Sequence, residues 1–257
     1  MNDSINTGSS GRVALAVLAH VALLVVWYLF VRIGDVPQFV MPSPGATLAA
    51  LFEPNYDWWG NIMVTGTEIF AGYLLALVVG VLLALVFTWS RPLEALFLPL
   101  FVTLNMIPKV ALGPLIIVWF KYGVLPNTLM AFSICVFPIL LTTARGLRDI
   151  EPELLDLVRS LRGSRWQLFT KIQLPGALPY VFAGMKVAAI LAVAGAIVGE
   201  FLGSDSGLGY LMLQVQVTLD TPAMFMAVIL ITLLGMLLYG IVLLLERLLV
   251  PRDARLA

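Results

Sequence analysis

The chain has 257 residues, of which 61% are hydrophobic and only 12% are charged. A soluble domain carries about twice that share of charged residues, and several apolar runs exceed the ~20 residues that cross a bilayer as a helix. The composition therefore excludes a soluble globular protein and predicts an integral membrane protein. The formal net charge of zero identifies no partner, and the single cysteine, Cys135, excludes an intrachain disulfide.

Apolar runs follow one another along the chain, and each is expected to be a helix, because the backbone must satisfy its own hydrogen bonds in lipid. The first run follows Arg12, and no small-residue cleavage site precedes Arg32, so it is interpreted as an uncleaved span rather than a signal peptide. The third is interrupted by the sequence IPK at residues 107–109. The expected spans are residues 13–33, 62–89, 93–120, 128–145, 176–200 and 223–246. We therefore predict an all-α polytopic bundle of about six transmembrane helices.

The distribution of basic residues predicts an orientation. The connections at residues 34–61 and 201–222 contain acidic residues but no Lys or Arg, whereas most basic residues flank the alternate connections. Positive residues remain in the cytosol, so both termini and the basic stretch at residues 146–174 are expected there. Arg32 and Lys121 depart from the pattern and are interpreted as snorkelling at outer span ends. The expected division is a cytosolic tail, a transmembrane domain and a second cytosolic tail, at residues 1–12, 13–250 and 251–257.

The basic stretch is expected to contain two short helices. Pro152 suits the first turn of the first helix, and apolar residues between positions 154 and 161 recur at helical spacing. Gly163 is a suitable place for that helix to end. Pro175 is expected to end the second helix and open the fifth span.

Ser164 and Gln167 fit a capping box that would begin the second short helix. Trp166 and Phe169 lie three residues apart and therefore share a face. Aromatic residues among arginines are the composition of an interface anchor. The alternative interpretation is a basic loop that rests on anionic lipid headgroups.

The same stretch resembles the cytoplasmic EAA motif of permease subunits in bacterial ABC importers, whose pattern is E-A-A-x3-G-x9-I-x-L-P. Its first half is degenerate in this chain and its second half is intact. The positions that correspond to the motif are Asp156, Leu157 and Val158 for E-A-A, Arg162 for the glycine, with Gly163 one residue late, and Ile172, Leu174 and Pro175 for the I-x-L-P end.

Further segments resemble the nitrate/sulfonate/taurine branch of these permeases. They are MPSP at 41–44, IPKVALGPLIIVWFKYG at 107–123, GSRWQLF at 163–169 and VGEFLGSDSGLGYL at 198–211. The resemblance covers residues 41–250 and implies a type I ABC importer permease fold. It also implies that residues 151–171 form the coupling helices that contact a separate ATPase. The coupling residues expected on this basis are Asp156, Arg159, Arg162, Gly163, Ser164, Arg165, Trp166, Phe169, Leu174 and Pro175.

The resemblance also implies the partners and the location of the protein. These are ABC ATPase subunits that bind ATP and Mg, an extracytoplasmic solute-binding protein, a second permease copy, and the lipid of the bacterial cytoplasmic (inner) membrane. No cofactor is expected on this chain, and no nucleic acid partner. The sequences LDTP at 219–222 and LLERLLVP at 244–251 resemble members linked to pyrimidine, thiamine-precursor or riboflavin uptake; sulfonate, taurine and nitrate remain alternatives.

Ionisable residues at membrane depth are functional candidates, because a charge there is costly. Lys109 follows a proline where a broken helix frees carbonyl groups, and Glu200 precedes a glycine-rich loop and is a candidate for a gate or a helix cap. With Glu68, these two form the expected translocation path or gate. A paired structural role is the alternative for each, and it is the preferred interpretation of His20 and Lys186.

Other features exclude or leave open further functions. The sequence has no P-loop, HExxH motif or nucleophile elbow, so it predicts neither an enzyme nor a metal site, and ATP hydrolysis must come from a partner. An ion-coupled secondary transporter or a channel is the alternative, but carriers of that kind usually contain inverted repeats, and no internal repeat is evident. Small residues at 188–199 predict close helix packing, either within the bundle or at a subunit interface.

Overall fold

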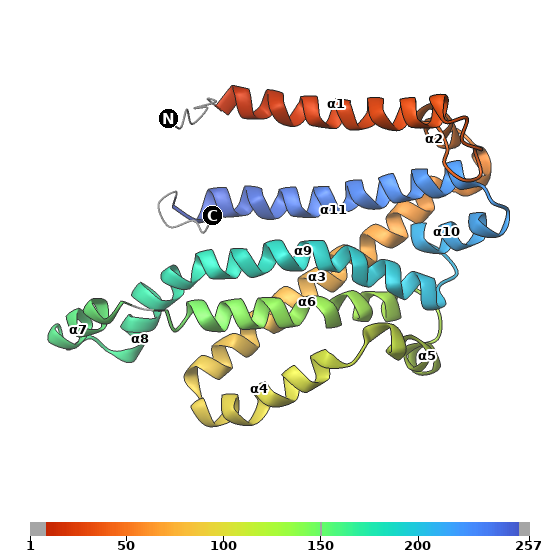
Figure 1. The fold of residues 1–257 in the computed structure, drawn as a ribbon. Helices are drawn as coiled ribbons and strands as arrows, with labels where there is room; N and C mark the ends of the chain where they lie inside the picture. The colour runs from red at the N-terminus through yellow and green to blue at the C-terminus, as the bar shows by residue number, and fades with distance from the viewer. Residues whose placement is uncertain (1–8, 150, 252–257) are drawn as a thin grey trace. The chain divides into compact units, whose positions relative to one another are not determined.

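The computed structural model describes residues 9–149 and 151–251, and the regular elements in this part of the chain are helices (Figure 1). The chain groups into two compact units, one of Met1–Asp57 and Met212–Ile229 and the other of Trp58–Leu211 and Leu230–Ala257. This grouping follows packing within the chain. The expected division into a transmembrane domain and two tails therefore stays a prediction, and most of both expected tails lies outside the described residues.

The longer helices correspond to the apolar runs of the sequence. Within the described residues, five helices are long and apolar enough to cross a membrane, or six if α4 and α5 form one bent span. The elements are α1 (Ser9–Ile33), α2 (Pro44–Ala50), η1 (Pro54–Tyr56), α3 (Trp58–Trp89), α4 (Arg91–Met106), α5 (Lys109–Phe120), α6 (Val124–Gly146), α7 (Pro152–Ser160), α8 (Arg165–Leu168), η2 (Phe169–Gln173), α9 (Leu174–Gly203), α10 (Leu208–Val217) and α11 (Thr221–Leu249). The all-helical, multi-pass prediction is confirmed.

The third expected span is bent. Helices α4 and α5 meet at an angle of 86°, and Ile107 between them has an extended backbone with ψ 124°. The cause is Pro108, because a proline ring disfavours the helical conformation of the residue before it. The sequence predicted the interruption at IPK but not the size of the bend.

Pro175 lies in the first turn of α9, as predicted, but it does not break the helical path from α8. Elements α8, η2 and α9 form one continuous helical stretch, Arg165–Gly203. Element η2 is a π-helical turn, after which the N–H of Leu174 bonds to the carbonyl of Phe169. This wide turn lies immediately before Pro175, which occupies the first turn of α9 and needs no N–H donor there. The short basic helix α8 is therefore joined directly to a membrane span.

The core of the larger unit is the packing of α6 against α3 and α9, and Figure 1 shows α9 running alongside α6. Ala131 of α6 lies opposite Gly72 of α3 and Gly195 of α9, and a Cβ atom added to either glycine would come within 2.6 Å of Ala131. The alanines of α9 with no exposed surface are Ala188, Ala189, Ala192 and Ala196. These small residues of 188–199 serve the bundle core, because small side chains let helix backbones approach closely in lipid.

The smaller unit is built around α1 and the connection that follows it. The Nε1 of Trp27 donates to the carbonyl of Pro42 at 3.0 Å, and its ring lies 5.7 Å from that of Phe225. The hydroxyl of Tyr56 donates to Asp220. The apolar span of α1 is exposed within the unit, which is a surface that lipid would cover.

Candidate functional site

Helix α7 ends in a turn that favours glycine. The N–H of Gly163 bonds to the carbonyl of Val158 at 2.8 Å, which is the long bond of a Schellman motif. Arg162 occupies the left-handed position of this motif, with φ 52°. The EAA motif places its glycine at the position of Arg162. The left-handed backbone gives a physical reason for that glycine, since a residue without Cβ adopts it at no steric cost.

Helix α8 begins with the predicted capping box. The N–H of Ser164 donates to Oε1 of Gln167 at 2.7 Å, and the N–H of Gln167 donates to Oγ of Ser164 at 3.2 Å. This reciprocal pair fixes the start of α8 only one residue after the turn at Gly163. The backbone of Trp166, which lies between the two capping residues, is therefore held by local hydrogen bonds.

The two aromatic residues of this segment differ in exposure. Trp166 is 63% exposed, whereas Phe169 is 8% exposed. The ring of Phe169 lies 5.2 Å from that of Trp89 at the end of α3 and 5.7 Å from that of Trp166. In this structure the ring of Phe169 is packed inside the chain, between Trp89 and Trp166. Its part in coupling to the ATPase stays a prediction.

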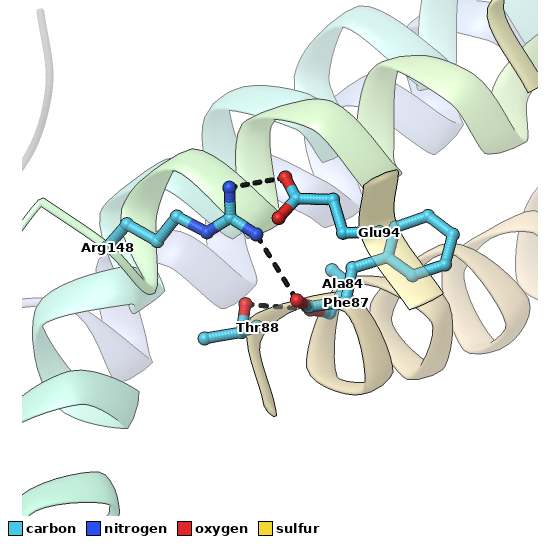
Figure 2. Close-up of polar contacts among 5 residues, drawn as sticks. All are labelled: Ala84, Phe87, Thr88, Glu94 and Arg148. Carbon is cyan, nitrogen blue, oxygen red and sulfur yellow. Dashed lines mark hydrogen bonds and ion pairs between the residues drawn. The ribbon is translucent and has the colours of Figure 1, made fainter. Parts of the chain in front are cut away.

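A polar network holds the connection before α7 against neighbouring helices. Arg148 pairs with Glu94 of α4 at 2.5 Å and also donates to the carbonyl of Phe87 of α3 at 3.2 Å (Figure 2). The hydroxyl of Tyr180 on α9 donates to Asp149. Arg148, Glu94 and Asp149 line a cavity of about 400 Å³ at this end of the bundle. The connection that precedes α7 is therefore fixed to α3, α4 and α9.

The remaining residues expected to couple to the ATPase lie mostly on the surface. The side chain of Arg159 lies outside the described residues, although its backbone belongs to α7. Gly163 is half-buried, and a Cβ there would meet Val158 at 2.7 Å. The exposed members of the set are Asp156, Arg162, Ser164, Arg165, Leu174 and Pro175. The structure thus brings most of them onto one accessible segment, residues 152–175, which we call the basic segment.

The opposite end of α9 contains a buried polar cluster at the N-terminus of α10. The first N–H groups of a helix have no partner within the helix, and here each has a side-chain acceptor. The N–H of Gly207 donates to Asn61 Oδ1 at 2.7 Å, and the N–H of Leu208 donates to Thr65 Oγ1 at 2.8 Å. The N–H of Gly209 and, at 3.3 Å, the N–H of Tyr210 both donate to Glu200 Oε2. Of the two roles expected for Glu200, the structure shows the helix cap.

Glu68 joins this cluster from α3. Glu68 has no exposed surface and Glu200 is 1% exposed. Thr65, which lies one turn before Glu68 on the same face of α3, donates to Glu200, so the two carboxyl groups are neighbours. The Nδ2 of Asn127 on α6 donates to Glu68 at 2.8 Å, and the hydroxyl of Thr65 donates to Glu200 at 2.5 Å. A role of either glutamate in a translocation path or gate stays a prediction. We name the set Asn61, Thr65, Glu68, Asn127 and Glu200 the buried cluster.

Lys109 does not lie in the buried cluster with the two glutamates. It lines a cavity of about 380 Å³ together with Asn105, Ser133 and three phenylalanines. Its Nζ donates to the carbonyl of Leu104 at 3.2 Å, across the break between α4 and α5. The same carbonyl also accepts the N–H of Ile107 at 3.4 Å, and a role of Lys109 in the translocation path stays a prediction.

Asn61, Thr65 and Asn127 were not among the site residues predicted from the sequence. Asn127 is a polar residue beside an apolar run, and a polar residue at membrane depth is a signal of function that could have identified it. Lys186, interpreted as a structural group, pairs with Glu246 at 3.1 Å.

The fold and these sites define a multi-pass helical permease, and comparison with known proteins identifies its family. Residues 76–252 match the family of binding-protein-dependent transport system inner membrane components. The chain belongs to this family. It is the inner-membrane permease component of a binding-protein-dependent ABC transporter, and it is not itself the ATPase.

Several named relatives are similar over most of their length. A probable ABC transporter permease protein of Haemophilus influenzae is 35% identical over 217 residues, which are 84% of this chain and 89% of the relative. The formylaminopyrimidine transport permease protein ThiX of Halalkalibacterium halodurans is 30% identical, over 91% of this chain and 94% of the relative. The riboflavin transport system permease protein RibX of Chloroflexus aurantiacus is 35% identical, over 90% and 87%.

A solved structure supports the fold. The chain is similar to a chain of the MetNI methionine ABC transporter in an inward-facing conformation, with a TM-score of 0.52 and 21% sequence identity. The likeness covers 79% of this chain and 98% of that chain. It confirms the predicted all-helical permease architecture.

Proposed function

We propose that the basic segment is the site at which this permease contacts its separate ATPase, with Trp166 as the anchor. The observation that carries the proposal is the exposure of Trp166, 63%, on a helix whose start is fixed by a capping box. Buried aromatic and arginine anchors provide most of the energy of protein interfaces. Arg162 and Arg165 precede Trp166 in the sequence, and they would pair with acidic groups at the rim of its pocket.

The proposal requires the basic segment to be cytosolic. The support is the charge distribution: the connections at 34–61 and 201–222 contain no Lys or Arg, and basic residues remain in the cytosol. A reporter fused after Arg162 should therefore read cytosolic, and one fused after Asp205 should read external. The opposite reading at either position contradicts the proposal.

The continuous helical stretch Arg165–Gly203 provides a route for coupling. Closure of the ATPases would push α7 and α8, and α9 would carry this displacement along its length, about 45 Å at 1.5 Å per residue. The far end of α9 contains Glu200 and the loop at 204–207, which would face the solute-binding protein. A second permease copy would complete the path, and differentially tagged copies that purify together would test this pairing.

We propose a small planar heteroaromatic solute, such as a pyrimidine or a flavin precursor. ThiX and RibX, two relatives that are 30% and 35% identical, are named for formylaminopyrimidine and riboflavin transport. The cavity at Lys109 offers Phe101, Phe132 and Phe137 for stacking and Asn105 and Ser133 for hydrogen bonds. Binding assays on the partner solute-binding protein should show affinity for such solutes, and preference for a sulfonate or nitrate contradicts the assignment.

Substitution of Trp166 tests the docking proposal. Truncation of an interface anchor costs about 2 kcal/mol or more, which is roughly a thirtyfold loss of affinity. Trp166→Ala should therefore release the ATPase from the detergent-purified transporter and abolish uptake, at an unchanged level of folded permease. The matched control is Trp59→Ala, because Trp59 is similarly exposed, at 68%, but lies on α3 near its start. Wild-type retention and uptake in Trp166→Ala would mean that the segment only contacts lipid.

A further inference from the structure

The buried cluster contains two carboxyl groups in contact without a nearby positive charge. In the described part of the chain, no Lys, Arg or His is among the groups that interact with Glu68 or Glu200. Two ionised carboxylates cannot remain side by side in a buried site, because both desolvation and mutual repulsion oppose the charged form. The pair must therefore hold a positive counterpart that the side chains do not supply.

The two carboxyl groups have unequal hydrogen-bond partners. Glu200 receives bonds from the hydroxyl of Thr65 and from the N–H groups of Gly209 and Tyr210. Two of these donors belong to the N-terminus of α10, where the helix dipole also favours negative charge. The site is built to hold Glu200 as a carboxylate.

Glu68 has a single donor, Nδ2 of Asn127, which bonds to Oε1. Its Oε2 receives no hydrogen bond and is one of two buried side-chain atoms without a partner among the described residues. A buried carboxylate oxygen without a donor is costly. A protonated Oε2 removes this cost, because it becomes a donor, and the carboxyl group of Glu200 is within its reach.

We propose that the Glu68–Glu200 pair is a proton-binding site that holds one proton on Glu68, shared as a hydrogen bond with ionised Glu200. The proton leaves a single negative charge in the buried cluster, and that charge is stabilised by the first turn of α10. This inference concerns the end of α9 opposite the basic segment, and it stands whether or not the ATPase contacts Trp166.

The site links the docking of α10 to protonation. The groups that hydrogen-bond to the two glutamates do not titrate: they are the side chains of Thr65 on α3 and Asn127 on α6 and backbone N–H groups of α10. Among these contacts, only the two glutamates can therefore gain or lose a proton. When the pair separates and is hydrated, both glutamates ionise at neutral pH, so the docked state binds one proton more than the separated state. The state that binds more protons is favoured at low pH. Docking of the first turn of α10 is therefore strengthened by acid and weakened by alkali.

Two substitutions of equal size distinguish the members of the pair. In Glu68→Gln, the amide oxygen still accepts from Asn127 and the amide NH₂ donates to Glu200, so every hydrogen bond is kept without the proton. In Glu200→Gln, the amide NH₂ faces a donor in either orientation: the N–H groups of Gly209 and Tyr210 at the Oε2 position, or the hydroxyl of Thr65 at the Oε1 position. At least one of these hydrogen bonds must therefore be lost or reversed. We expect Glu68→Gln to fold and Glu200→Gln to be destabilised or to fail to fold.

The experiment measures the full-length permease, purified in detergent, by thermal unfolding from mildly acidic to alkaline pH and by infrared spectroscopy. The wild type should unfold at lower temperatures as the pH rises, and at neutral pH it should show the C=O band of a protonated carboxylic acid. Glu68→Gln should lose both the pH dependence and the band. The control Glu53→Gln, at an exposed glutamate, should keep both.

A bound monovalent cation is the rival source of positive charge, and sodium chloride against choline chloride is its probe. The proposal is overturned if the unfolding temperature depends on sodium and Glu68→Gln is as damaging as Glu200→Gln, because both carboxylates would then be cation ligands. Absence of the carboxylic acid band from the wild type at neutral pH would also overturn it.

Discussion

The two ends of the continuous helical stretch Arg165–Gly203 use polar residues in opposite ways. At the first end, Trp166 and Arg165 are exposed, and the hydrogen bonds around them are local. At the other end, Glu200 is buried, and its partners come from α3 and α10. A polar group that serves a separate subunit must remain accessible, whereas one that joins helices of the same chain must be satisfied within it. Two features therefore distinguish a contact with another subunit from a contact between helices of one chain: the exposure of the side chain, and whether its hydrogen bonds are local or come from other helices.

Phe169→Ala should give the largest effect on stability, because Phe169 is the buried support of the exposed end. Removal of a buried phenylalanine costs about 3 kcal/mol or more. We expect this loss in the unfolding of purified permease, measured by circular dichroism in mixed micelles. Phe52→Ala, at a residue that is 84% exposed, should change little. Equal effects of the two substitutions would mean that Phe169 is not packed against Trp89.

Thr65→Val should have the next largest effect, at the buried end. The substitution keeps the shape of the side chain but removes the bond to Glu200 and the acceptor for Leu208, and a hydrogen bond to a charged group contributes about 2 kcal/mol. Thr67→Val on the same helix is the control, because its hydroxyl bonds only to the carbonyl of Met63. If Thr67→Val destabilises the protein as much as Thr65→Val in the same unfolding assay, the buried cluster does not hold α10.

Arg162→Gly should have the smallest effect on stability, and it should stabilise the protein, whereas the two preceding substitutions destabilise it. A left-handed backbone costs a residue with Cβ about 1 kcal/mol, so glycine should stabilise the turn after α7 by no more than this amount. Arg165→Gly is the matched control: it should destabilise α8, because glycine is a poor helix former. Unfolding of both variants under the same conditions makes the comparison, and a loss of stability in Arg162→Gly would contradict the assigned turn.

Local signals in the sequence predicted much of the exposed end. The spacing of Ser164 and Gln167 predicted the capping box, and Pro152 predicted the start of α7. The burial of Phe169 could not be predicted, because it depends on Trp89, which is far away in the sequence. The length of the helix after α8 was also missed, since the sequence contains Pro175 but does not reveal the π-helical turn that precedes it.

The buried end was predicted only in part. Hydropathy identified the spans, and their charged residues identified Glu68 and Glu200 as candidates. Their pairing was not visible, because it requires the packing of α3, α6 and α9. That packing depends on small residues such as Gly195, whose partner Ala131 belongs to another helix. The 86° bend at Pro108 was missed for the same reason, since proline predicts a break but its angle is set by packing.

Photo-crosslinking at position 166 tests the central claim most directly. A photoreactive amino acid replaces Trp166 in one preparation and the equally exposed Trp59 in another, and each assembled transporter is irradiated in its membrane. Peptide mass spectrometry then identifies the attached partner. We predict a covalent link to the ATPase subunit from position 166 and none from position 59. Attachment to lipid alone from position 166 would contradict the assignment of the basic segment as the ATPase contact.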